Sequence, residues 1–406
     1  MIQQQIDEIL REIKSCGILE SLYSNKKELI ENWLTLASIY SPSGGESKRA
    51  EYIKKKLLQM GIPHVYIDQV GNVIGILQTK KKGPTTAFLC TMDDLITIAD
   101  RVNSKKFPVR IENDKIVGPG TLITGSCVTL IALAKLLFAK KTELSGTIYL
   151  VAVVQEEQDF GGIRFFLQEN DDIDYVIDIM GGFGRIFYGA LGIKMLKVHF
   201  YGPSGHTLSG GLPNVNVALA EAITQIFEIP LPSRENLNNQ NYHNLGIGKI
   251  QLTGAYINIG MVKSGKSFNH KPEKGWLSVD LRSYDNEILN KLFEKITHIS
   301  ENIANKYDFK YQIEIYKDLP AAQISDAKNS QLVKFAEYIT IKLGKEVFLS
   351  DMGSTNMNIG ILKGILSIMV AGNEGGNHDT PNEYGNIDSI LDGTSFHFLL
   401  AYAIHK

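Results

Sequence analysis

The sequence predicts an α/β fold in which a main domain with a mostly parallel mixed sheet is interrupted by a smaller α+β domain. From about residue 29, short β-branched runs such as TTAFLCT, SGTIYLVAVVQ and YVIDIM alternate with helical patterns, which is typical of parallel strands covered by helices. The pattern changes near residue 190. The 406 residues also exceed the roughly 250 to 300 that one hydrophobic core supports, so we expect two domains.

The middle of the chain has the pattern of a split βαβ unit. Between residues 193 and 316 we expect strands in KMLKVHFYG, KIQLTGAYINIG, GWLSVDLRS and FKYQIEIY, with helices in NVNVALAEAITQIFE and EILNKLFEKITHISENIANKY. Strand and helix patterns resume after this segment. We therefore expect residues 1–192 and 317–406 to form one domain and residues 193–316 to be inserted into it.

Composition and charge exclude several classes of protein. The net charge is −2, from 42 basic and 44 acidic side chains, so no overall field favours nucleic acid or an anionic membrane. We expect no apolar run near the roughly 18 residues needed to span a bilayer. The three cysteines lack C-x-x-C spacing and are odd in number, which favours reduced thiols. A small, locally recognised ligand is expected.

The first residues predict an amphipathic helix. Ile6, Ile9, Leu10 and Ile13 recur at helical intervals among charged residues, whereas a signal peptide needs a continuous apolar segment. We therefore expect a cytoplasmic protein.

Acidic residues and a histidine stand where predicted strands end. Glu156 and Glu157 follow the apolar strand in VAVVQEEQDFGG, Asp178 lies near the end of DYVIDIMGG, and His378 lies in the polar loop after GILSIMVAG. Open α/β sheets bind ligands at the carboxyl ends of their strands, and carboxylates and imidazole are zinc ligands. The alternative is a pair of solvated surface acids and an ordinary loop histidine.

These motifs, taken together and in order, resemble a known superfamily. VAVVQEEQDFGG, DYVIDIMGG, HFYGPSGHTLSGGLPNVNVALA, SFNHKPEKGWLSVDLRS and HDTPNE follow the pattern of the co-catalytic di-zinc metallopeptidases, which include peptidase T, aminoacylase, carboxypeptidase G and succinyl-diaminopimelate desuccinylase. The resemblance runs from Ile39 onward. It implies a zinc-peptidase-like catalytic domain, an inserted lid that forms a homodimer, and a small peptide or N-acyl amino acid as ligand.

The resemblance assigns roles to residues of the catalytic domain. It implies that Glu156 is the general base and that Asp93 orients a metal-binding histidine. It places Glu157 and His378 on one metal and Asp178 on the other.

The resemblance also assigns roles in the lid. His206 falls on the histidine that stabilises the oxyanion in a neighbouring subunit's site. Asn269 and Arg282 fall on substrate-contacting positions. The alternatives are a turn residue for Asn269 and a rim salt bridge for Arg282.

The two N-terminal metal motifs depart from the family pattern. In AFLCTMDDLIT, Thr91 stands where the family has a histidine ligand, and a neutral hydroxyl is a far poorer zinc ligand than imidazole. In IVGPGTLITG, Ile123 stands where an aspartate should bridge both metals. Asn356 stands where relatives often have aspartate. We therefore expect at most one zinc ion, or none.

Two further features of the altered motifs bear on the ligands. Asp93 or Asp94 could supply a fourth oxygen to a single ion. Cys90 and Cys127 flank the altered motifs, and we expect buried structural thiols there rather than ligands or nucleophiles.

Three hypotheses for function follow. The first is a metal-dependent hydrolase of a peptide or amide bond, favoured by Glu156, Glu157, His206 and Arg282. The second is a non-catalytic pseudoenzyme that binds a peptide or amino-acid derivative, or scaffolds a partner, favoured by Thr91 and the missing bridging aspartate. A lyase or transferase without metal is a third, and no residue selects it.

Overall fold

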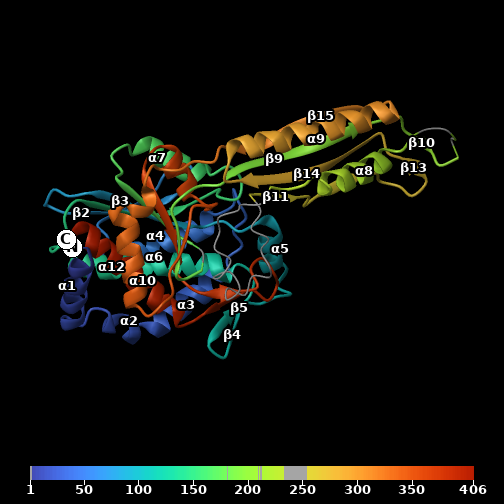
Figure 1. Ribbon diagram of the computed structural model, residues 1–406. Helices are drawn as coiled ribbons and strands as arrows, with labels where there is room; N and C mark the ends of the chain where they lie inside the picture. Colours follow the sequence, from blue (N-terminus) through green and yellow to red (C-terminus); the bar gives the residue numbers. More distant parts are fainter. Residues whose placement is uncertain (1, 181, 209, 211–212, 233–253) are drawn as a thin grey trace. The chain divides into compact units, whose positions relative to one another are not determined.

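The computed structural model describes the whole chain except residues 1, 181, 209, 211–212 and 233–253, and it forms two compact units (Figure 1). The first unit contains residues 1–189 and 323–406, and the second contains residues 190–322. Each unit has its own hydrophobic core.

A mixed sheet forms the centre of the first unit. Its strand order is β1 (His64–Ile67), β2 (Val73–Gln78), β6 (Thr147–Val153), β3 (Thr85–Thr91), β7 (Tyr175–Ile179), β17 (Leu366–Val370), β8 (Arg185–Phe187) and β16 (Phe348–Ser350). The strands from β6 to β17 are parallel, whereas β1, β2 and the β17–β8 pair are antiparallel. Every residue of β3 is buried, as expected for a strand covered on both faces. The predicted mostly parallel mixed sheet is confirmed.

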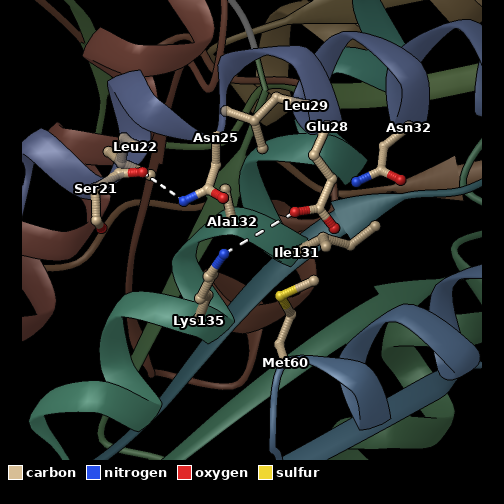
Figure 2. Close-up of a pocket in the computed structure, with 10 residues that line it drawn as sticks. All are labelled: Ser21, Leu22, Asn25, Glu28, Leu29, Asn32, Met60, Ile131, Ala132 and Lys135. Carbon is tan, nitrogen blue, oxygen red and sulfur yellow. Dashed lines mark hydrogen bonds and ion pairs between the residues drawn. The ribbon is translucent and has the colours of Figure 1, made fainter.

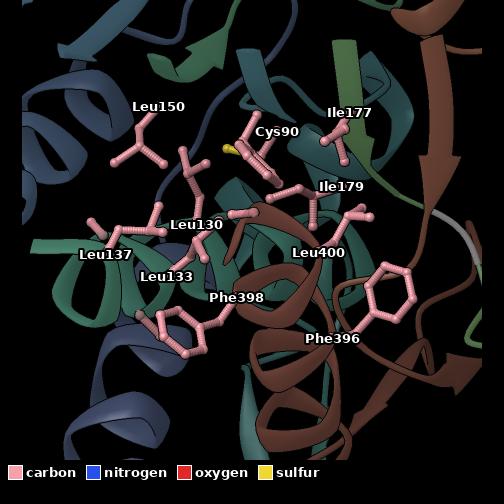
Figure 3. Close-up of a cluster of buried hydrophobic side chains, with 14 of the residues drawn as sticks. Cys90, Leu130, Leu133, Leu137, Leu150, Ile177, Ile179, Phe396, Phe398 and Leu400 are labelled. Atoms are coloured by element: carbon pink, nitrogen blue, oxygen red, sulfur yellow. The ribbon is translucent and has the colours of Figure 1, made fainter. Parts of the chain in front are cut away.

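Long apolar helices pack against this sheet. Helix α6 (Thr121–Lys140) contacts β3, α12 (Ser389–His405) and α3 (Lys26–Ala37). Leucines of α6, phenylalanines of α12 and side chains of the central strands belong to one hydrophobic cluster (Figure 3). The other helices of the unit are α1 (Ile2–Ser15), α2 (Glu20–Ser24), α4 (Ser47–Gln59), α5 (Ile96–Ser104), α7 (Gly161–Glu169), α10 (Gln331–Lys342), α11 (Met357–Leu362) and the short 3₁₀ helix η1 (Ala327–Asn329).

Helix α6 corrects one expectation from the sequence. Its 20 residues are long and apolar enough to cross a membrane, although no such run was expected. Of the residues in its apolar window, 72% lie buried inside the structure. The helix is apolar on all sides because other helices and the sheet surround it, which is the property of a core helix. The expected amphipathic helix at the N-terminus is confirmed, since α1 buries Ile6, Ile9 and Ile13.

A small second sheet holds the C-terminal loop that carries His378. Its strand order is β18 (Gly375–Gly376), β19 (Tyr384–Asn386), β5 (Lys115–Val117) and β4 (Arg110–Glu112). Strand β19 pairs with β5, which directly precedes α6. The loop between β18 and β19 is therefore anchored at both ends near the start of α6.

The second unit is a sheet covered by two helices. Its strand order is β11 (Ala255–Asn258), β14 (Lys274–Ser283), β9 (Gly192–Tyr201) and β15 (Lys310–Leu319), and all neighbours are antiparallel. Short β12 (Val262–Ser264) also pairs with β14, and β10 (Gly205–His206) pairs with β13 (His270–Lys271). Helices α8 (Val215–Phe227) and α9 (Asn286–Tyr307) pack against it.

The connections of this unit confirm the predicted split βαβ pattern. Strands β9 and β11 run parallel with β14 between them, and β14 and β15 run parallel with β9 between them. The first part of the strand expected in KIQLTGAYINIG lies outside the described residues, and its second part is β11.

Candidate active site

Asp93 fixes the turn that carries the two predicted functional glutamates. It follows β3 and is completely buried. Its Oδ1 accepts the backbone N–H of Glu156 at 3.1 Å, and its Oδ2 accepts the backbone N–H of Glu157 at 3.0 Å. Hydrogen bonds to a charged acceptor contribute about 1.5–3 kcal/mol each. The structure therefore brings Asp93, Glu156 and Glu157 together, because the Asp93 carboxylate binds the backbone N–H groups of both glutamates.

A second carboxylate supports the same turn one residue earlier. Gln155 adopts a left-handed conformation with φ of 60°, and its N–H donates to Glu46 Oε1 at 3.0 Å. The same Glu46 oxygen accepts the N–H of Gly44 at 2.8 Å. Two carboxylates, those of Glu46 and Asp93, therefore hold the strained turn after β6 by hydrogen bonds to its backbone. Glu156 is 7% exposed, so a base at this position works in a largely dehydrated environment.

Thr91 occupies the place that the resemblance gives to a histidine ligand, and its hydroxyl already has a partner. Thr91 Oγ1 accepts a hydrogen bond from Asn356 Nδ2 at 2.9 Å, and both side chains are buried. The Thr91 carbonyl accepts the Cys127 thiol at 3.1 Å. A neutral hydroxyl and a neutral amide therefore meet where two ligand-type residues were expected.

Asp178 is a buried carboxylate with few compensating contacts. It lies on β7, completely buried, and its Oδ2 accepts the N–H of Met357 at 3.2 Å. Its Oδ1 has no hydrogen-bond partner among the described residues. Burial raises the pKa of Asp178 to about 6, because the charged form loses hydration, and the Thr355 hydroxyl and the N–H groups of Met357 and Asn356 offset part of this effect. A cation or a proton would satisfy this group.

Asp94 has a structural partner. Its Oδ2 pairs with Arg49 Nη2 at 2.8 Å, and both side chains are buried. Arg49 also donates to the carbonyls of Met92 and Ile39, at 2.5 Å and 3.0 Å. Burial raises the pKa of Asp94, and the Arg49 charge partly offsets this effect. Asp93 and Asp94 were the two candidates for a fourth oxygen ligand to a metal ion. Asp93 instead binds backbone N–H groups, and Asp94 binds the buried Arg49 guanidinium.

The two flanking cysteines are buried free thiols. Burial raises the pKa of the Cys90 thiol well above its usual range, which disfavours the nucleophilic thiolate.

The loop between β18 and β19 brings three ligand-type side chains together. In His378, Asp379 and Glu383, one ligand atom of each lies within 4.8 Å of the others, and within the described part of the chain this is the one such group. His378 Nδ1 lies 3.8 Å from Asp379 Oδ2. The predicted ligands Glu157 and Asp178 are not members of the group. Their role as ligands stays a prediction.

Glu383 is the fixed member of this group. It is 1% exposed, its Oε1 accepts the N–H of Leu122 at 2.7 Å, and its Oε2 accepts the N–H of Asp379 at 3.0 Å. Burial raises the pKa of Glu383 to about 7. Sequence reasoning did not single out Asp379 or Glu383, although both stand in the HDTPNE motif that identified His378.

In the second unit, the structure brings two of the three predicted residues together. His206 on β10 lies beside Asn269, with 3.4 Å between Nε2 and the amide nitrogen. His206 Nδ1 lies 3.2 Å from the backbone nitrogen of Leu208, whose N–H donates to it. Arg282 instead pairs with Asp280 on the same strand, at 3.0 Å. Both the substrate contact and the salt bridge named for Arg282 remain open, and its contact with substrate stays a prediction.

A separate pocket lies among the helices of the first unit (Figure 2). A weak ion pair at 3.9 Å between Glu28 and Lys135 crosses it. None of the predicted site residues lines it; its lining is Ser21, Leu22, Asn25, Glu28, Leu29, Asn32, Met60, Ile131, Ala132 and Lys135.

A two-domain α/β architecture with an inserted α+β unit and paired glutamates after a central strand defines the class of the protein as metallopeptidase-like. The sequence model of Peptidase family M20/M25/M40 matches residues 92–403, and the chain belongs to this family. The chain resembles peptidases and amidohydrolases of this family. Family members act on peptides or amino-acid derivatives, and they generally use zinc or other divalent metals.

Relatives with known names share parts of the sequence. Succinyl-diaminopimelate desuccinylase of Corynebacterium glutamicum is 26% identical over 278 residues, which is 66% of this chain and 69% of that protein. A candidate LysW-lysine/LysW-ornithine hydrolase of Pyrococcus abyssi is 36% identical over 141 residues, but the match spans only 34% of this chain and 36% of that protein.

Solved structures share the fold along nearly the whole chain. An M20 family metallo-carboxypeptidase from Sulfolobus solfataricus has a TM-score of 0.74 at 20% identity, covering 93% of this chain and 99% of that chain. At this identity the likeness establishes the fold.

Proposed function

We propose that the protein hydrolyses an amide or peptide bond of a small peptide or N-acyl amino acid and binds at most one divalent cation. One observation carries the proposal: the Asp93 carboxylate accepts hydrogen bonds from the backbone nitrogens of Glu156 and Glu157, at 3.1 Å and 3.0 Å. A buried carboxylate used to fix these two residues supports a catalytic turn that retains its form although the histidine it would orient is replaced by Thr91.

In this proposal Glu156 is the general base. Its carboxylate takes a proton from the attacking water and passes it to the leaving amine. A bound divalent cation would supply Lewis-acid polarisation of the scissile carbonyl. By resemblance, Asn269 and Arg282 orient the substrate.

The proposed role of His206 requires a second copy of the chain. Its imidazole would donate a hydrogen bond to the carbonyl oxygen, and in the family the equivalent histidine acts in the neighbouring subunit's site. We therefore propose a homodimer. Sedimentation of the protein as a monomer at micromolar concentration would remove this role for His206.

Two side chains support the proposed limit of one cation. The Thr91 hydroxyl is engaged by the Asn356 amide at 2.9 Å, and Ile123 offers no ligand atom. Two cations close together need a bridging anion to offset their repulsion, which grows as their separation falls. Without that bridge, the donor set supports a single ion.

The test is hydrolysis of a panel of dipeptides and N-acyl amino acids by the zinc-supplied protein. Glu156→Gln should reduce kcat by about 100-fold or more, because it removes the general base but keeps the size of the side chain. Glu169→Gln is the matched control, since Glu169 lies exposed at the end of α7. Absence of turnover in wild type, or equal turnover in Glu156→Gln, would contradict the proposal.

The second candidate is a non-catalytic binding protein. The observation that favours it is the neutral Thr91–Asn356 hydrogen bond in place of a metal ligand. It predicts that some panel members bind, as measured by calorimetry, and that none is hydrolysed with or without zinc.

A further inference from the structure

We propose that the cation is held by the loop between β18 and β19, through His378, Asp379 and Glu383. This inference deepens the proposed function, because it names the residues that hold its single ion. It differs from the family pattern, in which His378 would act with Glu157 and Asp178 would serve a second metal.

The distances suit one ion after a small contraction. Ligand atoms around a tetrahedral zinc at roughly 2.1 Å lie about 3.4 Å apart. His378 Nδ1 and Asp379 Oδ2 are 3.8 Å apart, and the group as a whole lies within 4.8 Å. The side chains of His378 and Asp379 are 59% and 47% exposed, so they can rotate without disturbing the core. One imidazole nitrogen and two carboxylate oxygens form a donor set that selects zinc or a similar transition ion over calcium or magnesium.

Glu383 makes the site partly preorganised. Its two oxygens are fixed by the N–H groups of Leu122 and Asp379, and each oxygen keeps a lone pair for a cation. Its own carbonyl accepts the N–H of Gly118 at 2.8 Å. The bond from Asp379 N–H to Glu383 also keeps two of the three ligands next to each other before any ion binds.

An unpaired buried oxygen nearby adds to the case. Asp94 Oδ1 is buried and has no hydrogen-bond partner within the described residues. It faces Gly120, where an added Cβ would lie 2.9 Å from it, and Gly120 precedes the first turn of α6 that Glu383 binds. The negative charges of Asp94 and Asp379 act on each other. Arg49 neutralises one of these carboxylates, and a cation in the loop would offset the remaining negative charge.

The experiment is calorimetric titration of zinc into the metal-stripped chain of 406 residues. The variants are Asp379→Asn, Glu157→Gln and Asp178→Asn, with Asp388→Asn as the control for loss of a surface carboxylate. Asp379 has a φ of 60°, and asparagine tolerates this left-handed conformation, so the variant should fold. Thermal unfolding of each metal-free variant checks this directly.

We expect Asp379→Asn to weaken zinc binding by at least about tenfold, because even the loss of a group that merely supports a ligand costs 10- to 100-fold. Glu157→Gln, Asp178→Asn and the control should stay within about twofold of wild type. The inference is overturned if wild type does not bind zinc, if Asp379→Asn binds as wild type does, or if Glu157→Gln or Asp178→Asn loses affinity equally.

These outcomes are distinct from those of the proposed function. Zinc binding that depends on Asp379 in a protein without hydrolytic activity leaves the inference standing and removes the function. If the protein hydrolyses its substrate and its zinc affinity depends on Glu157 and not on Asp379, the proposed function stands and the inference about the loop is overturned.

Discussion

Replacement of Asp93 by asparagine tests how the glutamate turn is held. Asparagine has the same shape, but it offers one acceptor oxygen and one NH2 group where the carboxylate offers two oxygens. One of the two N–H groups, of Glu156 or Glu157, then faces another donor in a buried position. Loss of a charged acceptor and an unsatisfied buried N–H together cost about 2–4 kcal/mol of unfolding free energy.

The measurement is urea unfolding of Asp93→Asn followed by tryptophan fluorescence. The chain has two tryptophans, so a Trp276→Phe background leaves Trp33 as the only reporter. Trp33 is completely buried in the first unit and donates to the Thr121 carbonyl at 2.8 Å. It therefore reports the unfolding of the unit that contains Asp93, which matters because a two-unit protein need not unfold in one step.

The control for this experiment is Asp388→Asn in the same background. Asp388 is exposed and pairs with Lys26 at the surface, so its loss should change the unfolding free energy by less than about 0.5 kcal/mol. If Asp93→Asn also stays within this limit, the carboxylate does not hold the turn, and the argument for a preserved catalytic turn is lost.

Three further predictions concern buried charges. Arg49→Met leaves Asp94 buried without its partner and should cost about 3–5 kcal/mol by urea unfolding, whereas the double variant Arg49→Met/Asp94→Leu should recover part of the loss. Burial lowers the pKa of His405 from 6.5 to about 4. The unfolded chain therefore binds more protons between these values, and up to about 3 kcal/mol of stability should be lost as the pH falls from 6.5 to 4, with a shallower slope in His405→Gln. Asp178 has its pKa raised from 3.8 to about 6, so its charge destabilises the metal-free fold above pH 6. Asp178→Asn should stabilise that fold at pH 7.5 by up to about 3 kcal/mol, and the gain should vanish near pH 4.

The sequence predicts the fold well where burial alone decides the pattern. The continuous apolar runs became β3, β6 and β7 because helices cover both faces of the sheet. The run VYIDQVGNVIGIL, by contrast, divides into antiparallel β1 and β2. Asp68 Oδ1 accepts the N–H groups of Val70, Gly71 and Asn72, and Gly71 has a φ of 110°. This turn depends on a side-chain bond that hydrophobic periodicity does not report.

The sequence is less informative about the site because its contacts join distant segments. It shows that Thr91 is not a histidine, but it does not show that an amide 265 residues away, that of Asn356, takes up the hydroxyl. It shows the adjacent residues Asp93 and Asp94, but their different partners are set by how the chain folds after β3. Asp379 and Glu383 stand in a motif already recognised, yet the hydrogen bond from the Asp379 N–H to Glu383 forms in a loop where Asn377 and Asp379 adopt left-handed conformations, which the motif does not show.

The most direct test of the central claim is the number of cations that the folded chain binds. Elemental analysis of zinc-reconstituted protein, combined with an anomalous scattering map of its crystals at the zinc edge, gives both the count and the position. We expect one zinc per chain, beside His378, Asp379 and Glu383. Two fully occupied ions, or no ion at millimolar zinc, would contradict the account.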